Sequence, residues 1–289
     1  MGTMTGKRVM VTGATNGIGE VAAIELAGMG AAVTLVSRSE EKLAATAEKI
    51  RAAGSQDVDT IQADLSSIEQ TRAAAAAYLS RHDRLDVLLN NAGAVFADRH
   101  DSIDGIEMTL ALNHLSYFIM TNELTDLLKQ TAAQHGEARI VNVSSEAHRS
   151  GMNWDDIQYE KAWSNMGFGA YGQSKCMNIL HAVELAQRLE GTGVTANALH
   201  PGLVATGFGR NNGCFSNVLV NILQVFAKSP AQGAETSIYL ASSAAVGGIT
   251  GKYFADSREK EPIPAAVSSE NATRLWAYTE RLLSEKAAS

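Results

Sequence analysis

Cysteine is scarce in this sequence, which has only Cys176 and Cys214 among its 289 residues. A disulfide framework or a zinc site needs more cysteines, so this content is typical of a reducing compartment. We therefore expect a cytoplasmic protein without a bound metal. Proline is scarce too, with four residues, and no repeat or low-complexity segment divides the chain. One domain over residues 1–289 is the expected organisation.

Long apolar runs and an excess of basic residues are also missing. No run approaches the roughly 20 residues that cross a bilayer, and the N-terminus enters an expected strand too soon to leave room for a signal peptide. Lysine and arginine number 24 against 31 acidic residues, which gives a net charge of −7. Because nucleic acids and anionic membranes would not attract such a chain, we expect no nucleic-acid partner and no membrane anchor.

Aromatic residues make up only 6% of the chain, whereas hydrophobic residues make up 45%. This mixture, rich in Ala, Gly and Val, suits helices packed tightly on a sheet. Short β-branched runs alternate with longer helical stretches, which is typical of a parallel sheet with crossover helices. The runs are almost entirely apolar, as expected of strands covered on both faces. We predict an α/β fold, a single doubly wound (Rossmann-type) domain with a mostly parallel sheet flanked by helices on both faces.

These patterns also place the elements along the chain. Strands are predicted at 8–12, 32–37, 58–62, 85–89, 139–143 and 194–199, with a last one near Tyr253. Helices are predicted at 20–29, 40–53, 68–80, 114–133 and 171–190. Within the one domain, 6–110 is expected mainly to bind a cofactor, 111–260 to supply catalytic and substrate-loop elements, and 261–289 to form a C-terminal extension.

A glycine-rich turn, TGATNGIG, joins the first expected strand to the first helix. Its glycines are Gly13, Gly17 and Gly19. In such a turn the first glycine allows a tight bend, and the later ones let a pyrophosphate approach the backbone. The unpaired N–H groups at the helix N-terminus then face the phosphates. In this strand–turn–helix context the turn predicts a dinucleotide site.

The spacing G-x-x-x-G-x-G resembles that of the short-chain dehydrogenase/reductase family. Other pieces follow in that family's order, namely Asn90-Asn91-Ala92-Gly93, Asn113, Ser144-Ser145, Tyr171-Gly-Gln-Ser-Lys175 and His200-Pro201-Gly202. The long interval between Ser145 and Tyr171, with IVNVSSEAH before it and HPGLVATGF after it, resembles the retinol dehydrogenase-like branch. The resemblance implies an oxidoreductase that acts on CH–OH and C=O groups.

The end of the second expected strand selects the cofactor. An acidic residue there would bind the ribose hydroxyls of NAD. This chain has Ser37-Arg38 instead, and an arginine suits a 2′-phosphate, so NADP(H) is expected; an arginine that only faces solvent is the alternative. With the resemblance, the expected cofactor-binding residues are Gly13, Thr15, Asn16, Gly17, Ile18, Gly19, Ser37, Arg38, Asp64, Leu65, Asn91, Ala92, Gly93, Tyr171, Lys175, Pro201, Gly202, Val204 and Thr206.

Tyr171 and Lys175 are four residues apart and so share one face of a helix. A tyrosine hydroxyl titrates near pH 10, and a nearby ammonium is expected to lower that pKa toward neutrality. The resemblance implies that Tyr171 is the acid–base group and that Ser145 binds the substrate oxygen, with Ser144 as the alternative. It also implies that Asn113 holds a water linking Lys175 to solvent.

The expected substrate is a bulky, mainly apolar carbonyl or alcohol. Trp154, Trp163 and Phe168, together with the apolar residues of 208–227, are candidate pocket walls, although packing on the core explains the 208–227 segment equally well. A C=C reductase with the same tyrosine and lysine, and a non-catalytic NADP(H)-sensing regulator, stay open. The presence of Ser145, Tyr171 and Lys175 together favours the enzyme, and a homo-oligomer is left open.

Other reactive side chains carry weaker signals. The histidines His114, His148 and His181 have no partner at metal or triad spacing, so they are expected to pack in the core or to lie on the surface. Cys176 is expected to be a core or interface thiol.

Overall fold

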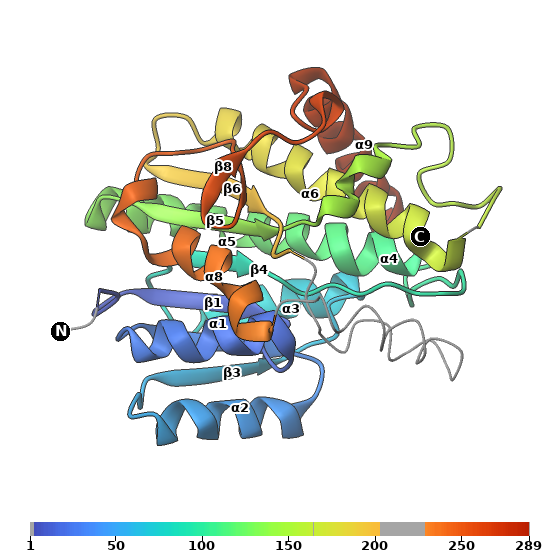
Figure 1. The fold of residues 1–289 in the computed structure, drawn as a ribbon. Coiled ribbons are helices and arrows are strands. Elements are labelled where there is room, and N and C mark those ends of the chain that lie inside the picture. The colour runs from blue at the N-terminus through green and yellow to red at the C-terminus, as the bar shows by residue number, and fades with distance from the viewer. Residues whose placement is uncertain (1–2, 164, 203–228, 289) are drawn as a thin grey trace.

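The computed structural model of the protein describes residues 3–163, 165–202 and 229–288. Within them, one sheet of eight strands has the order β3-β2-β1-β4-β5-β6-β7-β8 (Figure 1). Strands β1 to β7 pair in parallel, and β8 pairs antiparallel with β7. The strands are β1 Arg8–Thr12, β2 Ala32–Ser37, β3 Val58–Gln62, β4 Val87–Asn90, β5 Ala138–Val143, β6 Val194–Leu199, β7 Tyr253–Ala255 and β8 Arg258–Lys260. The expected mostly parallel sheet is confirmed.

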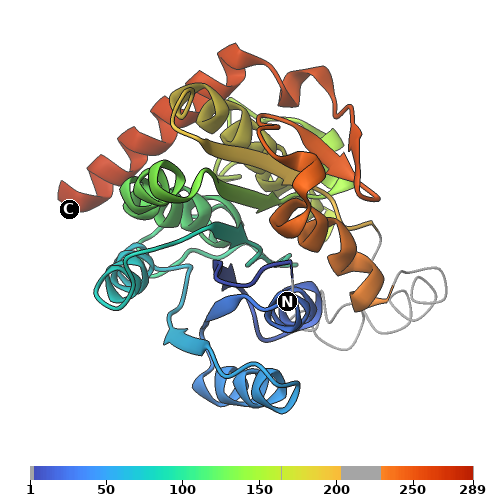
Figure 2. The same cartoon turned by 90° about the vertical axis from the view of Figure 1, so that its left-hand side faces the viewer.

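Helices cover both faces of this sheet, as the end-on view shows (Figure 2). One apolar core contains Leu26, Leu43 and Leu240, and the other contains Leu128 and Leu180. The helices are α1 Gly17–Gly28, α2 Glu40–Ala52, α3 Ile68–Leu79, α4 Met108–Leu110, α5 Ser116–His135, α6 Phe168–Arg188, α8 Pro230–Ser242 and α9 Ser269–Ala288. None of the helices in the described ranges is both long and apolar enough to cross a membrane. The doubly wound architecture is confirmed.

The strand order places a crevice beside β1. β2 and β3 lie on one side of β1, and β4 to β8 lie on the other. Where the order of parallel strands reverses in this way, the connecting helices diverge and leave a crevice at the carboxyl ends of the strands. Thr12, Asn90 and Val143 end β1, β4 and β5 at this edge. The fold therefore brings three of the sequence motifs to one place.

Most element boundaries agree with the sequence patterns. The expected strands 8–12, 32–37, 58–62 and 194–199 coincide with β1, β2, β3 and β6. Helices α1 and α6 begin about one turn before their expected starts, at Gly17 and Phe168. In α1 the last residues of the glycine motif form the first helical turn, and in α6 the residues just before the Tyr171 motif do. The expected helix 114–133 corresponds to α5, which α4 and a π-helical turn, η1, Ala111–Leu115, precede. A π-turn has no distinct pattern in sequence.

Helices α8 and α9 lie where no helix is expected. Ser229 and Gln232 form a capping box at the start of α8, with Pro230 at its first position. Helix α9 occupies the expected C-terminal extension and packs on α6, with Trp276 in ring contact with Phe118 and His181. The signal for α9 was present, because its buried residues recur at helical spacing. They are Ala272, Leu275, Trp276, Thr279, Leu282 and Leu283.

The first prediction tests whether α9 is an integral part of the core. Trp276 is 7% exposed and the Arg188 guanidinium lies 4.1 Å from its ring. Trp276→Ala should lower the free energy of unfolding by about 3–5 kcal/mol, the usual cost of removing a buried aromatic side chain. Urea denaturation measures it. Ile103→Ala is the control, because Ile103 is 86% exposed. A Trp276→Ala protein as stable as this control would contradict the packing described.

Candidate active site

The turn after β1 lies directly against the end of β4. Gly13 has a φ of +66°, and a Cβ there would lie 2.8 Å from the Cα of Ala92. A Cβ on Gly19 would collide with the side-chain amide of Asn91 and the carbonyl oxygen of Gly13. Asn91 Nδ2 fixes this approach by donating to the carbonyl oxygen of Thr12 at 2.9 Å. Bare backbone therefore faces the crevice in front of the α1 N-terminus, where an anion is favoured.

A cleft of about 540 Å³ runs along the carboxyl ends of the strands, a size typical of cofactor sites. The expected cofactor-binding residues that line it are Gly13, Thr15, Asn16, Gly17, Ile18, Gly19, Ser37, Arg38, Asp64, Leu65, Asn91, Ala92, Gly93, Tyr171, Lys175 and Pro201. Gly202 follows Pro201 and donates its N–H to His200 Nδ1 at 2.9 Å. Val204 and Thr206 lie outside the described residues. The bare glycine backbone and the cleft fit a nicotinamide dinucleotide.

One end of the cleft carries positive charge. Arg38 lines it together with Lys42, which lies one turn further on in α2. Among the described residues, no carboxylate forms an ion pair with either side chain. Thr15 Oγ1 and Ser37 Oγ lie 2.8 Å apart and tie the glycine turn to the end of β2. Lys42 is absent from the expected site. Its position four residues after Arg38, in the first turn of the predicted helix 40–53, could have indicated a second cation at this end of the cleft.

The other end of the cleft holds the tyrosine and the lysine. Lys175 Nζ lies 5.5 Å from the centroid of the Tyr171 ring, so the two side chains share one face of α6 as expected. Ser145 forms a side-chain hydrogen bond with Tyr171. Ser144 lines the cleft, but its hydroxyl donates to the carbonyl oxygen of Lys175 at 2.6 Å. The two serines thus differ in what their hydroxyls bind.

Burial controls the proton affinities of this pair. It raises the pKa of Tyr171 to about 12, and the hydrogen bond from Ser145 opposes that rise. Burial also lowers the pKa of Lys175 to about 7. The expected lowering of the tyrosine pKa by a neighbouring ammonium is therefore wrong for the protein's own residues. Desolvation disfavours the charged form of both groups and is the largest cause of both shifts.

Asn113 lies in η1, behind the cleft wall. Its Oδ1 accepts from Ala94 N at 2.9 Å, and its Nδ2 donates to the Ala94 carbonyl oxygen at 2.9 Å and to Ser174 Oγ at 3.0 Å. The amide thus holds the chain after β4 in place. A Cβ on Gly93 would lie 3.2 Å from both Asn113 Oδ1 and Lys175 Nζ. The lack of a side chain at Gly93 therefore lets Asn113 and Lys175 lie close to the backbone there.

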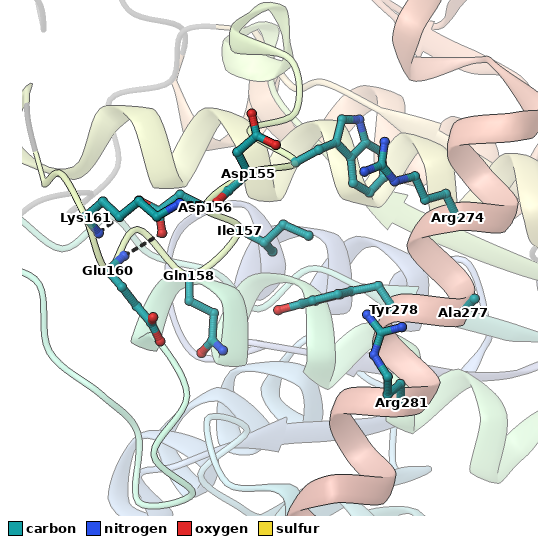
Figure 3. Close-up of a pocket in the computed structure, with 11 residues that line it drawn as sticks. Asp155, Asp156, Ile157, Gln158, Glu160, Lys161, Arg274, Ala277, Tyr278 and Arg281 are labelled. Atoms are coloured by element: carbon teal, nitrogen blue, oxygen red, sulfur yellow. Dashed lines mark hydrogen bonds between the residues drawn. The ribbon is translucent and has the colours of Figure 1, made fainter.

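The aromatic residues expected to wall the substrate pocket are not among those lining this cleft. Trp154 stacks under the Arg274 guanidinium at 4.2 Å and lines a separate cavity of about 470 Å³. Figure 3 shows this cavity between segment 154–161 and α9. Trp163 donates to the Ala97 carbonyl oxygen at 2.7 Å, and Phe168 is 52% exposed. The 208–227 segment lies outside the described residues. The apolar side chains that do line the cleft include Val95, Phe96, Met108 and Leu112.

The remaining candidate groups are structural. Burial lowers the pKa values of His114, His148 and His181, and all three are nearly inaccessible, so they pack in the core. Cys176 is fully buried, and burial raises the pKa of its thiol to about 12. In the part of the chain that the structure describes, no three His, Cys, Asp or Glu side chains are grouped to hold a metal ion.

Comparison with known proteins agrees with this geometry. A family model described as short chain dehydrogenase matches residues 7–214. The chain belongs to the short-chain dehydrogenase family. This short-chain dehydrogenase is 40% identical over 294 residues to retinol dehydrogenase 13 of Homo sapiens, and the match covers 99% of this chain and 87% of the relative. The expected retinol dehydrogenase-like branch is confirmed.

Two solved structures of cofactor complexes are similar to this short-chain dehydrogenase. One is the RhlG/NADP active-site complex of Pseudomonas aeruginosa, with a TM-score of 0.70, 28% identity, and coverage of 93% of this chain and 97% of that one. The other is the NADH-dependent reductase A1-R' complexed with NAD, with a TM-score of 0.67, 27% identity, and coverage of 86% and 94%. The protein is thus an oxidoreductase that uses a nicotinamide dinucleotide.

The second prediction concerns the glycine turn of this short-chain dehydrogenase. Gly19→Ala should weaken dinucleotide binding at least about tenfold, because the added Cβ displaces Asn91 and the turn that faces the pyrophosphate. Isothermal titration calorimetry measures the affinity. Gly28→Ala is the matched control at the other end of α1, since a Cβ there meets no atom within 4 Å. Equal affinities in the two variants would refute the proposed cradle.

Proposed function

We propose that this short-chain dehydrogenase interconverts a carbonyl and an alcohol on a bulky, mainly apolar substrate, with NADP(H) as cofactor. The observation that carries this proposal is that Tyr171, hydrogen-bonded to Ser145, and Lys175 line one end of a cleft whose other end is a glycine cradle. When bound, the nicotinamide donates or accepts the hydride. Every other part of the chemistry falls to the protein's own side chains.

Tyr171 is the proposed acid–base group. Because its pKa is held at about 12 by burial, its hydroxyl is protonated at neutral pH and can donate a proton to a carbonyl oxygen. Ser145, hydrogen-bonded to Tyr171, is placed to donate to the same oxygen as negative charge develops on it. The hydroxyl of Ser144 is engaged by the Lys175 carbonyl, which favours Ser145 for this role.

Lys175 and Asn113 have supporting roles in this proposal. Lys175 lines the cleft and would hold the nicotinamide ribose when the cofactor is bound. Asn113 positions the backbone around Ala94 through its two hydrogen bonds there. The proposed water link from Asn113 to Lys175 fits less well, because both Nδ2 hydrogens of Asn113 already have protein acceptors.

Preference for NADP(H) over NAD(H) is proposed from charge. Arg38 and Lys42 border the cleft at the end of β2, where an acidic residue would be needed to bind ribose hydroxyls. Their cationic groups are suited to a 2′-phosphate. The solved relatives with bound NADP and NAD support a nicotinamide cofactor of either kind, so this preference rests on the two cations alone.

The substrate class is proposed from the lining of the cleft and from the relatives. Val95, Phe96, Met108 and Leu112 give the cleft an apolar side, and human retinol dehydrogenase 13 is named for a long apolar alcohol. No observation favours a C=C reductase or a silent regulator. The cytoplasmic location and a homo-oligomeric state stay predictions.

The third prediction tests the acid–base role. Tyr171→Phe should lower turnover at least about a hundredfold, the usual scale for a positioned proton donor, and should leave NADPH affinity nearly unchanged. Steady-state kinetics and fluorescence titration measure the two quantities. Tyr278→Phe removes the same atom in the cavity of Figure 3, away from the cleft, and should retain full activity. Normal turnover in a folded Tyr171→Phe protein would rule out the mechanism.

The fourth prediction tests the cofactor preference. Arg38→Ala should weaken NADPH binding about ten- to a hundredfold, the cost of losing a charge-assisted contact, and should affect NADH little. Lys42→Ala should act in the same direction. Arg51→Ala is the control, because Arg51 lies on α2 like Lys42 but forms an ion pair with Glu48. An unchanged ratio of NADPH to NADH affinities in Arg38→Ala would show that the preference has another origin.

A further inference from the structure

The carbonyl oxygen of Val143, at the end of β5, is the acceptor for three side-chain donors. Lys175 Nζ donates to it at 3.1 Å, Asn178 Nδ2 at 3.2 Å and the Tyr117 hydroxyl at 3.5 Å. A carbonyl oxygen has two lone pairs. Three donors from α5 and α6 thus share two acceptor positions.

Only one of these donors borders the cleft. Lys175 lines it, whereas Asn178 and Tyr117 are 0% and 1% exposed and lie behind it. A buried carbonyl without a donor costs free energy. If Lys175 were the sole donor, its turning toward the cleft would leave the oxygen of Val143 unpaired. With Asn178 in place, this carbonyl stays paired when Lys175 leaves it.

The orientation of the Asn178 amide follows from its surroundings. If the amide were reversed, its Oδ1 would face the carbonyl oxygen of Val143, and two acceptors would meet without a proton between them. Asn142 Nδ2 supports this segment by donating to the Asn178 carbonyl oxygen at 3.3 Å. The amide therefore points the positive end of its dipole at the oxygen that Lys175 also binds.

Titratable groups around Lys175 are uncharged at neutral pH. Tyr171 on α6 and Tyr117 on α5 face it, with ring centroids 5.5 and 5.9 Å from Nζ, and burial raises the pKa of both hydroxyls. Behind Asn178 lies His114 of η1, whose pKa is lowered to about 4 by burial against a rise from the Asn178 contact. His181 of α6 is likewise kept neutral by burial and by His114. The proton affinity of Lys175 thus depends mainly on burial and on its hydrogen-bond partners.

We propose that Asn178 is a positioning residue for Lys175, because its amide holds the carbonyl oxygen of Val143 and so frees the lysine to turn into the cleft. Tyr117 is the weaker second holder of the same oxygen. The proposal rests on the role given to Lys175 above, and Asn178 itself touches neither substrate nor cofactor. Without the amide, only the longer bond from Tyr117 shares the carbonyl with Lys175, and the ammonium form of Lys175 is held more tightly.

The test measures the proton affinity of Lys175 in the protein without cofactor. In Asn178→Leu, the competing donor and its positive dipole end are lost, so the pKa of Lys175 should rise by about half a unit to one unit, the equivalent of one hydrogen bond. NMR titration of protein labelled at lysine Cε and Nζ reports this value, and Lys175→Arg assigns the resonance. Tyr117→Phe should shift the pKa in the same direction by less, because its bond is longer.

Asn90→Leu is the matched control. Asn90 is equally buried at 0% exposure, but its Nδ2 donates to Thr121 Oγ1 and Asn142 Oδ1. It should leave the Lys175 pKa unchanged. An unchanged pKa in both Asn178→Leu and Tyr117→Phe, or an equal shift in Asn90→Leu, would overturn the proposal. If Asn178→Leu does not fold, Tyr117→Phe decides alone.

Kinetics separate this inference from the proposed function. Asn178→Leu should lower kcat about tenfold, the equivalent of one lost hydrogen bond, with little change in KM for the carbonyl. A wild-type protein that reduces no carbonyl would contradict the proposed function and leave the NMR result intact. An active wild-type enzyme with an unshifted Lys175 in the variants would contradict the positioning role alone.

Discussion

The site depends on how closely the turn after β1 approaches the end of β4. A Cβ at Gly13 or Gly19 would not fit this contact, and Asn91 locks it with a hydrogen bond to the end of β1. The approach leaves bare backbone before α1 and sets the width of the cleft there. The same segment continues to Gly93, which lets Asn113 and Lys175 come close to the chain. One steric constraint thus connects the cofactor end of the cleft to the tyrosine and lysine.

Burial then gives the other end of the cleft its chemical character. Desolvation keeps Tyr171 protonated and lowers the pKa of Lys175 to about 7. A protonated tyrosine suits proton donation, and the proton affinity of a buried lysine depends on its hydrogen-bond partners. The shared acceptor at Val143 is such a partner, since three donors share its carbonyl oxygen. The proposed chemistry therefore depends as much on what surrounds the reactive groups as on the groups themselves.

Sequence patterns predicted the parts of the molecule that are local in the chain. The boundaries of four strands agree with the β-branched runs, and sixteen of the cofactor-binding residues expected from the motifs line one cleft. Features that depend on tertiary packing were missed. Trp154 packs against Arg274 of α9, a contact that no local pattern records, so its expected place in the pocket is not observed. The pKa of Tyr171 is raised and not lowered as expected, because the side chain is buried and burial depends on the whole fold. The domain division and the roles of the site residues stay predictions.

The central claim is hydride transfer to a carbonyl carbon, and isotope transfer tests it most directly. NADPH carrying deuterium at nicotinamide C4, prepared as each of the two epimers, would be incubated with a long-chain α,β-unsaturated aldehyde, and the product analysed by mass spectrometry and NMR. The account predicts that one epimer delivers deuterium to the former carbonyl carbon and gives the unsaturated alcohol. Deuterium at the β-carbon would indicate C=C reduction, and no transfer across a panel of such aldehydes would indicate a protein that binds the cofactor without using it. Either result would contradict the account.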